Sequence, residues 1–453
     1  MKHLILALAA SATALSATAD VVPEVSGVTM TQPVTQRRVT ISYRLEKAPA
    51  IITLDVQTNK TGAATDVAAD WVSVGGEALN ATTGDVWKKV AVGDHEIVWC
   101  PDVSWRGQQV AAARAVVTAW SADNPPDYLV VDLTEGAAAN SERYYPAVEF
   151  LPGGLLANKD YRMTRLVMRR IPACDATWTM GSTALMEGDW GRVAKSEKTH
   201  LVTLTNDYYI GVFEITQQQY LLVQPDGYAN KGGAAYFTNE NEMRPAEYMT
   251  YNEIRNSEKS ATANTAFDWP NDPNSGSFLG KLRTKTGLKF DLPSEAQWEF
   301  ACRAGTTSGY WNDGSAIVGK DSDANLDRLG RTKNNGGFVG SAEPAATVGA
   351  TNGTAIVGSY ASNVWGLYDM HGNVWELCLD WYEDDIVSFD GRVNIDPTDS
   401  TKTLSGATGA NRVRRGGGWQ NTADYARSAS RVSRAPNSAS SNVGFRLVLP
   451  VGE

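Results

Sequence analysis

The sequence predicts an α+β protein with an N-terminal β-sandwich followed by an irregular, loop-rich domain. The chain has 453 residues, and a single hydrophobic core stops growing at roughly 250–300 residues, so at least two domains are expected. Short runs of alternating apolar and polar residues fill the N-terminal third. The 14 tryptophans and 41 glycines, combined with few helical patterns, are typical of a compact fold dense in turns.

The first 19 residues have the pattern of a secretory signal peptide. Lys2 and His3 precede the apolar stretch 4–15, and Ala17-Thr18-Ala19 is a small-x-small cleavage site. The mature chain is therefore expected to begin near Asp20 and to be exported, to the periplasm or outside the cell. The residue directly after the cleavage site is Asp20, not a cysteine that could carry a lipid, and no later stretch reaches 18 apolar residues, so no membrane anchor is expected.

Residues 20–135 are predicted to form the β domain. Apolar and polar residues alternate in Val39–Leu45 and again in 52–57, which is the signature of half-buried strands. Further strands are expected at Glu96–Trp99, Ala112–Trp120 and Tyr128–Leu133, with Gly and Pro turns between them. This spacing favours a sandwich of immunoglobulin or fibronectin type. We find no catalytic constellation in this domain, so a spacer or interaction role is expected.

Residues 136–160 are predicted to be a linker, because Glu135–Asn140 is weakly patterned and 152–154 reads Pro-Gly-Gly. The second domain is expected to cover 161–453. Two helix starts are readable there, since Thr216 with Gln219 and Ser294 with Gln297 each fit a capping box.

The charge balance argues against a nucleic-acid partner. The net charge is −10 and the isoelectric point is about 5.1, whereas such binders usually show a basic face. The one basic run, Arg412-Val413-Arg414-Arg415, is expected to be the solvated side of a strand.

Six segments of the second domain resemble, in order, the motif blocks of the formylglycine-generating (sulfatase-modifying factor) enzyme family. They are Trp178–Ser182, Tyr208–Tyr220, Leu292–Gly305, Trp365–Glu376, Arg415–Trp419 and Asn442–Arg446. The resemblance implies a C-type-lectin-like fold with short strands, two main helices and long ordered loops. Most of the motif tryptophans are expected to pack in its core.

The cysteine pair that the family uses for catalysis is missing from the expected places. The family's enzymes bind copper through two thiolates shortly after the Gly-Gly block, where this chain has Asn421 and Ala426. No cysteine occurs in residues 379–453. Cu(I) requires soft ligands such as thiolates, so copper is not an expected cofactor. The family's iron-dependent branch needs a histidine cluster, and the four histidines of this chain are scattered.

Calcium is the metal that the resemblance still implies. The carried-over site has His371, Gly372 and Val374 as carbonyl donors and Glu376 as the carboxylate. A second site would begin at Asn325 and Leu326, although Gly349-Ala350-Thr351 provides no acidic partner there. The alternative for Glu376 is a buried carboxylate satisfied by backbone donors.

The four cysteines, in an exported chain, make a disulfide plausible. Cys302 and Cys378 are the expected pair because both lie in motif blocks near the core, while Cys100 and Cys174 offer competing pairings.

Two functions follow for the second domain. The first is a non-catalytic, lectin-like binding module for a protein or glycan ligand, because residues 420–442 are built largely from Asn, Ser, Ala and Arg and include Tyr425, the adaptable composition of many recognition loops. The alternative is an oxidoreductase of formylglycine-generating type, acting on protein cysteine through an altered active site. The expected binding residues are Trp419, Gln420, Asn421, Asp424, Tyr425 and Arg427.

Overall fold

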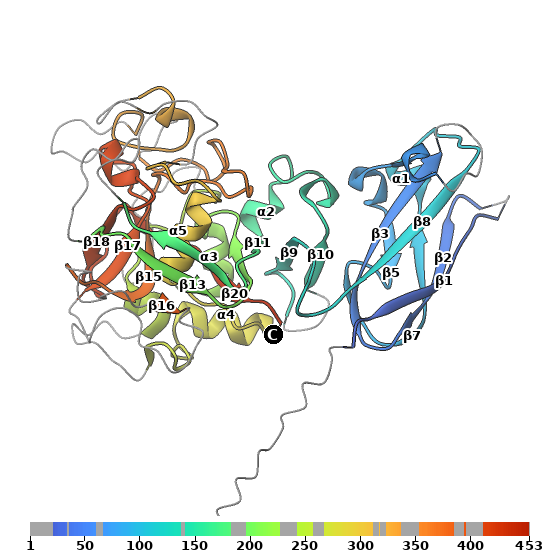
Figure 1. Cartoon of the computed structure of the whole chain (residues 1–453), viewed down its shortest axis with the longest axis horizontal. Coiled ribbons are helices and arrows are strands. Elements are labelled where there is room, and N and C mark those ends of the chain that lie inside the picture. Colours follow the sequence, from blue (N-terminus) through green and yellow to red (C-terminus); the bar gives the residue numbers. More distant parts are fainter. Residues whose placement is uncertain are drawn as a thin grey trace, which may run out of the picture.

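Figure 1 shows the computed structural model of the chain, with the smaller N-terminal unit at the right and the larger C-terminal unit at the left. The expected signal peptide lies outside the described residues. The structure describes residues 21–33, 36–59, 67–136, 141–182, 196–226, 242–256, 267–310, 317, 323–336, 353–384, 394–395 and 411–452.

The N-terminal unit consists of two antiparallel sheets. One has the strand order β1-β2-β7-β5, and the other has the order β4-β3-β6 with β8 also paired to β3. The strands are β1 (Glu24–Thr31), β2 (Val39–Glu46), β3 (Ala50–Asn59), β4 (Trp71–Ser73), β5 (Thr82–Gly84), β6 (Lys88–Val90), β7 (Gly93–Trp99) and β8 (Ala113–Trp120), and β7 is followed by the short helix α1 (Pro101–Ser104).

The alternating pattern of β2 is confirmed as a half-buried strand. Ile41, Tyr43 and Leu45 are buried, while the intervening Ser42 and Arg44 are exposed. Most of the buried apolar side chains of β2, β3 and β7 belong to one hydrophobic cluster, so the two sheets share a core.

The strand predicted at 128–133 forms, but it belongs to a different sheet from the one expected. β9 (Tyr128–Asp132) pairs with β10 (Glu142–Tyr145) on one side and with β11 (Arg165–Ile171) on the other. Its first four residues are all buried, which a strand covered on both faces requires. The predicted linker 136–160 is corrected accordingly, because it contains β10 and the 3-10 turn Val148–Phe150.

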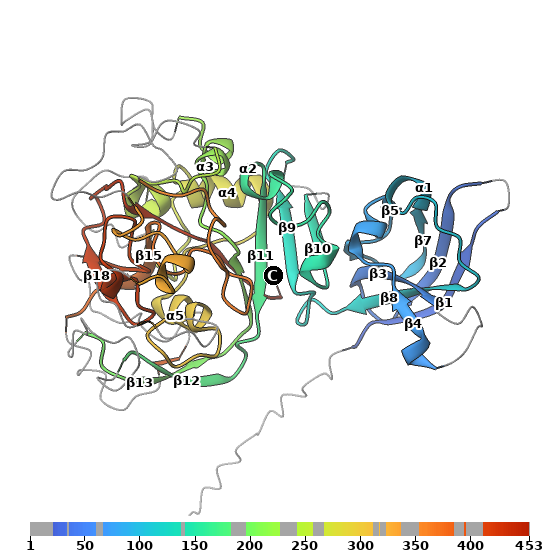
Figure 2. The same cartoon turned by 90° about the horizontal axis from the view of Figure 1, so that it is seen from above.

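These segments pack directly on the N-terminal sheets. In both views β9 and β10 lie between the N-terminal unit and β11 (Figures 1 and 2). The Tyr144 amide donates to the Trp87 carbonyl at 2.9 Å, and the Trp87 ring stacks on Tyr145 with centroids 5.2 Å apart. A Cβ on Gly76 would lie 2.1 Å from the Glu149 carbonyl oxygen, so this contact requires glycine.

The C-terminal unit is a sheet-rich mixture of strands and a few short helices. The strands that the structure describes in this unit form sheets with the orders β10-β9-β11-β14-β20, β12-β13-β16 and β18-β17-β15-β19. The remaining elements are β12 (Ala176–Met180), β13 (His200–Leu204), β14 (Tyr208–Gly211), β15 (Trp375–Trp381), β16 (Asn394–Ile395), β17 (Arg412–Arg415), β18 (Arg431–Arg434), β19 (Val443–Gly444), β20 (Val448–Pro450), α2 (Asp160–Met163), α3 (Gln217–Val223), α4 (Phe278–Thr286) and α5 (Glu295–Arg303).

Both predicted capping boxes are confirmed. The Thr216 hydroxyl accepts from the Gln219 amide at the start of α3, and Ser294 does the same with Gln297 at the start of α5. In each box the glutamine side chain also accepts from the cap residue's amide. Within the part of the chain that the structure describes, no helix is long and apolar enough to cross a membrane.

Candidate binding site

Residues from three of the motif blocks meet around a buried ion pair in the C-terminal unit. Glu376 on β15 accepts from Arg446 through both oxygens, at 2.6 and 2.7 Å, and from the Trp298 indole at 2.7 Å. All three side chains are fully buried. The motif residues therefore brace the fold at this point, because a carboxylate bonded by a guanidinium fork and an indole is fully satisfied.

In the predicted calcium site, the carboxylate of Glu376 is already engaged by other groups of the fold. Both Glu376 oxygens are taken by Arg446 and Trp298, and a cation would have to displace a guanidinium. The His371 ring bonds the Ala426 carbonyl at 2.8 Å, and burial lowers the pKa of His371 to about 4. The amides of Gly372 and Val374 donate to the Gly416 carbonyl and to Glu214.

The second expected site is similarly committed to local structure. The Leu326 carbonyl closes a 3-10 turn by accepting from the Leu329 amide at 2.8 Å, and the Asn325 amide donates to Asp323 at 2.8 Å. Residues 349–351 lie outside the described residues. Among those described, no cluster of three or more His, Cys, Asp or Glu side chains could hold a metal ion.

We therefore expect calcium to leave the stability of this protein unchanged. A ligand that binds only the folded state raises the melting temperature, and the oxygens of Glu376 are already in use. Melting curves in excess calcium and in excess chelator should coincide. A calcium-dependent rise that Glu376→Gln removes would contradict this expectation.

The predicted Cys302–Cys378 disulfide is not formed in the structure, where all four cysteines are free. The two buried thiols face different neighbours. Cys302 Sγ contacts Ser428 Oγ at 3.5 Å and His371 Nε2 at 4.0 Å, whereas Cys378 Sγ contacts the Glu376 carbonyl at 3.9 Å.

The basic run on β17 is a strand, as predicted, but it is not solvated. Arg412 and Arg415 are at most 1% exposed. Arg412 pairs with Asp268 and lies 3.3 Å from the centroid of Trp381, while Arg415 pairs with Glu299. Alternation with an apolar residue suggested a solvent-facing side, but carboxylates distant in the sequence neutralise these arginines inside the fold.

Two of the six expected binding residues are likewise buried. Trp419 is 0% exposed and donates to the Ser441 carbonyl, and Arg427, 1% exposed, makes a bidentate pair with Glu197 at 2.7 and 2.9 Å. Both hold the loop in place, so neither side chain faces a ligand. This corrects the prediction for these two residues.

The other four expected binding residues lie at least partly at the surface. Tyr425 is 42% exposed, and Gln420, Asn421 and Asp424 are half-buried. Asn421 Oδ1 accepts from the Trp375 indole at 2.8 Å, and Tyr425 meets the Trp375 ring edge-on with centroids 6.1 Å apart. The loop after β17 therefore folds over Trp375 and presents amide and phenol groups beside it.

Sequence reasoning missed the cationic part of this face. The Arg414 guanidinium lies 4.8 Å from the centroid of the Trp375 ring, and Arg434 on the neighbouring strand β18 lies on the same side of the sheet, because Arg412 pairs with Arg434 in the strand register. The sequence did contain an indication of this cationic face, because residues 412 and 414 of one strand must point to the same side of the sheet.

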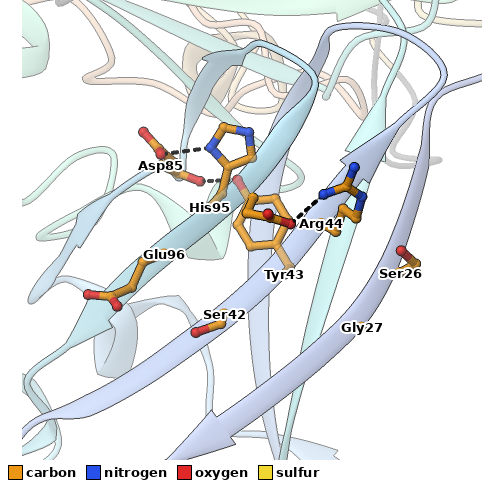
Figure 3. Close-up of a pocket in the computed structure, with 9 residues that line it drawn as sticks. Ser26, Gly27, Ser42, Tyr43, Arg44, Asp85, His95 and Glu96 are labelled. Carbon is orange, nitrogen blue, oxygen red and sulfur yellow. Dashed lines mark hydrogen bonds and ion pairs between the residues drawn. The ribbon is translucent and has the colours of Figure 1, made fainter.

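A separate hollow of about 640 Å3 lies on the N-terminal unit and is lined by residues such as Tyr43, Arg44 and His95 (Figure 3). Several of its polar groups are already paired. His95 contacts Asp85 at 2.9 Å and the Ala91 carbonyl at 2.7 Å, and Arg44 bonds Asp94 at 2.8 Å. The face around Trp375 is therefore the better candidate for a binding site.

The fold and the paired charges define an α+β domain whose interior contains buried arginine–carboxylate pairs. Residues 169–451 match the family described as "Sulfatase-modifying factor enzyme 1-like domain". This match covers more than half of the chain, so the chain belongs to that family.

Curated relatives agree with this assignment over part of their length. The chain is 32% identical to a formylglycine-generating enzyme of Thermomonospora curvata over 163 residues, which cover 34% of this chain and 48% of that enzyme. It is 34% identical over 155 residues to serine/threonine-protein kinase pkn1 of Chlamydia caviae, covering 34% of this chain and 20% of the kinase. The chain thus spans about half, or less, of these relatives.

Among solved structures, variable protein 1 of Treponema denticola matches with a TM-score of 0.42 and 22% identity, covering 63% of this chain and 95% of that protein.

Proposed function

We propose that this protein is exported and that its C-terminal domain is a non-catalytic binding module. The proposal rests on the motif resemblance, which puts Asn421 and Ala426 at roughly the positions where the family's enzymes have their two copper-binding thiolates, and on the lack of any cysteine in residues 379–453. Neither an amide nor a methyl group can replace a thiolate as a ligand of Cu(I).

The surroundings of both residues support this reading. The Asn421 side chain is engaged with the Trp375 indole and with Asn442, and Ala426 is 1% exposed. Ala426 is also closely packed, because a Cβ on Gly417 would lie only 3.0 Å from its backbone. These positions act as parts of a folded loop that covers Trp375.

For the alternative, an oxidoreductase with an altered active site, the cysteines within the motif blocks are Cys302 and Cys378. Both thiols are fully buried. Burial raises the pKa of Cys302 to about 12, and it also raises the pKa of Cys378 well above its usual range. Both are therefore protonated at neutral pH, whereas nucleophilic and metal-binding cysteines act as thiolates. The Cys302–His371 contact does not change this, because His371 is neutral and buried as well.

We assign a supporting role to the N-terminal unit. Its two antiparallel sheets support an immunoglobulin- or fibronectin-like sandwich. Its packing through Trp87 on Tyr145 supports a module that holds the C-terminal domain at a fixed orientation rather than on a free linker.

Catalysis is tested directly by incubating the purified protein with copper, oxygen and a peptide that carries a Cys-x-Pro-x-Arg motif. We expect no conversion of the peptide cysteine, measured by mass spectrometry, while an active formylglycine-generating enzyme run in parallel converts it. An aldehyde product from this protein would overturn the proposal.

Export predicts that the mature protein begins near Asp20, because the apolar stretch 4–15 precedes a small-x-small cleavage site. Edman sequencing of protein from the native host should read Asp20 or a neighbouring residue. A chain that retains Met1 inside the cytoplasm would contradict export.

A further inference from the structure

The strand pair β17–β18 carries five arginines, and the structure divides them into two groups. Three have carboxylate partners. Arg412 pairs with Asp268, Arg415 with Glu299, and Arg431 with Glu295. The other two, Arg414 and Arg434, form no ion pair with any acidic residue that the structure describes.

Arg414 also lacks hydrogen-bond partners among the described residues. Its guanidinium makes no hydrogen bond within the described chain, its Nε is buried, and its one defined contact is the Trp375 ring. Burial and the neighbouring Arg434 together lower the pKa of Arg414 to about 10. Among the residues that the structure describes, Arg434 bonds only the carbonyls of Ser438 and Ala439, at 3.1 and 2.5 Å.

Two guanidiniums that repel each other in partly desolvated surroundings lower the stability of the fold, because neither is neutralised. The protein as a whole is acidic, with a net charge of −10. Two neighbouring arginines without a carboxylate partner among the described residues are therefore unusual in this chain. An anionic group supplied by a ligand would neutralise both side chains. Two forked donors are suited to a planar carboxylate.

The rim of this face favours a peptide as the source of the carboxylate. Tyr425 is 42% exposed, and the half-buried amides of Gln420 and Asn421 lie on the same loop. Tyrosine and amide side chains are the adaptable contacts of protein-recognition loops, and arginine clusters read acidic motifs in peptides. Arginine and tyrosine are also enriched among residues that dominate binding energy.

We propose that Arg414 and Arg434, with Tyr425 at their rim, bind an acidic side chain of a peptide segment. This inference rests on the proposed binding function and names the ligand class that its site takes. Arg414 approaches the ligand carboxylate from the face of Trp375, and Arg434 approaches it from the neighbouring strand. Gln420 and Asn421 contact the peptide beside it.

The test uses the mature full-length protein and two dye-labelled hexapeptides, identical except that two glutamates in one are glutamines in the other. Fluorescence anisotropy should show at least tenfold tighter binding of the glutamate peptide, weakening as salt is raised. Arg414→Gln should abolish the preference, and Arg434→Gln should reduce it. Arg38→Gln, which removes an exposed charge from the N-terminal unit, should leave it unchanged.

Stability gives a second, independent readout. Arg414→Gln should melt at the same temperature as the wild type or higher, because it removes an unneutralised cation. If that variant fails to fold, Arg414→Lys keeps the charge but lacks the fork, and it should bind the glutamate peptide more weakly than the wild type.

Equal affinity for the two peptides, an unaltered preference in Arg414→Gln, or tighter binding of a uronic-acid oligosaccharide than of the glutamate peptide would each overturn this inference. The hexapeptides contain no cysteine, so none of these results bears on catalysis. Aldehyde formation on the Cys-x-Pro-x-Arg peptide would instead overturn the proposed function.

Discussion

Replacing Arg446 by methionine is expected to lower the free energy of unfolding by about 3–5 kcal/mol, as is typical when one partner of a buried ion pair is removed. Arg446 is fully buried and bonds both oxygens of Glu376, and its remaining donors reach the carbonyls of Gly211 and Tyr368, each at 2.9 Å. Methionine fills similar volume but leaves the Glu376 carboxylate with the Trp298 indole alone.

Urea denaturation followed by tryptophan fluorescence measures this loss. The double variant Arg446→Met with Glu376→Leu should recover much of it, because replacing both charges by apolar groups is often close to neutral. Arg44→Met, which breaks the exposed Arg44–Asp94 pair, should show no measurable change. If Arg446→Met were as stable as the wild type, the ion pair would not brace the fold.

The sequence predicts regular elements well where one local pattern decides them. The alternation in β2 and the two capping boxes involve residues within a few positions of each other, and the structure confirms all three. The expectation that most motif tryptophans pack in the core is also confirmed, since Trp298, Trp375 and Trp419 are at most 1% exposed, while Trp178 and Trp365 are half-buried. Local patterns suffice there because burial follows directly from side-chain chemistry.

The sheet to which a strand belongs cannot be read in the same way. Residues 128–131 read Tyr-Leu-Val-Val, without alternation, and this is compatible with a strand buried on both faces in either unit. The pairing of β9 with β11 depends on a segment more than thirty residues later in the chain. Sequence spacing alone therefore put the unit boundary too late.

The candidate site shows the same limit for charged residues. Arg415 and Glu299 pair across 116 positions, and Arg427 and Glu197 across 230. A local charge pattern cannot reveal such partners, so it assigns buried arginines to solvent. The sequence therefore does not show that Arg414 lacks a carboxylate partner, because this depends on which carboxylates the fold brings to Arg412, Arg415 and Arg431.

The buried carboxyl group of Asp369 is expected to make the stability of the fold depend on pH. It is 1% exposed, its Oδ2 accepts from the Gly358 amide at 2.7 Å, and its Oδ1 has no hydrogen-bond partner among the described residues. Burial, with a contribution from Glu376, raises the pKa of Asp369 from 3.8 to about 6. The pKa of the nearby Glu214 is raised by burial and by Asp369.

A folded-state pKa above the unfolded value means that the native state favours the protonated acid. The stabilisation from protonated Asp369 is therefore complete below a pH of about 4 and is lost as the pH rises through about 6. At roughly 1.36 kcal/mol for each unit of pKa difference, the loss is on the order of 3 kcal/mol.

Asp369→Asn should remove this loss, because an amide stays neutral at every pH in the range. Its oxygen can still accept from the Gly358 amide, and asparagine tolerates the left-handed backbone at this position, where φ is 58°. Relative to the wild type, the variant should gain stability progressively between pH 4 and pH 7, and urea denaturation across this range measures the gain.

The control is Asp102→Asn, which replaces an exposed carboxylate in the N-terminal unit. Its free energy of unfolding should differ from that of the wild type by the same amount at every pH. A difference in free energy of unfolding between Asp369→Asn and the wild type that stays constant from pH 4 to pH 7 would contradict this prediction. It would mean that ionisation of Asp369 does not destabilise the fold.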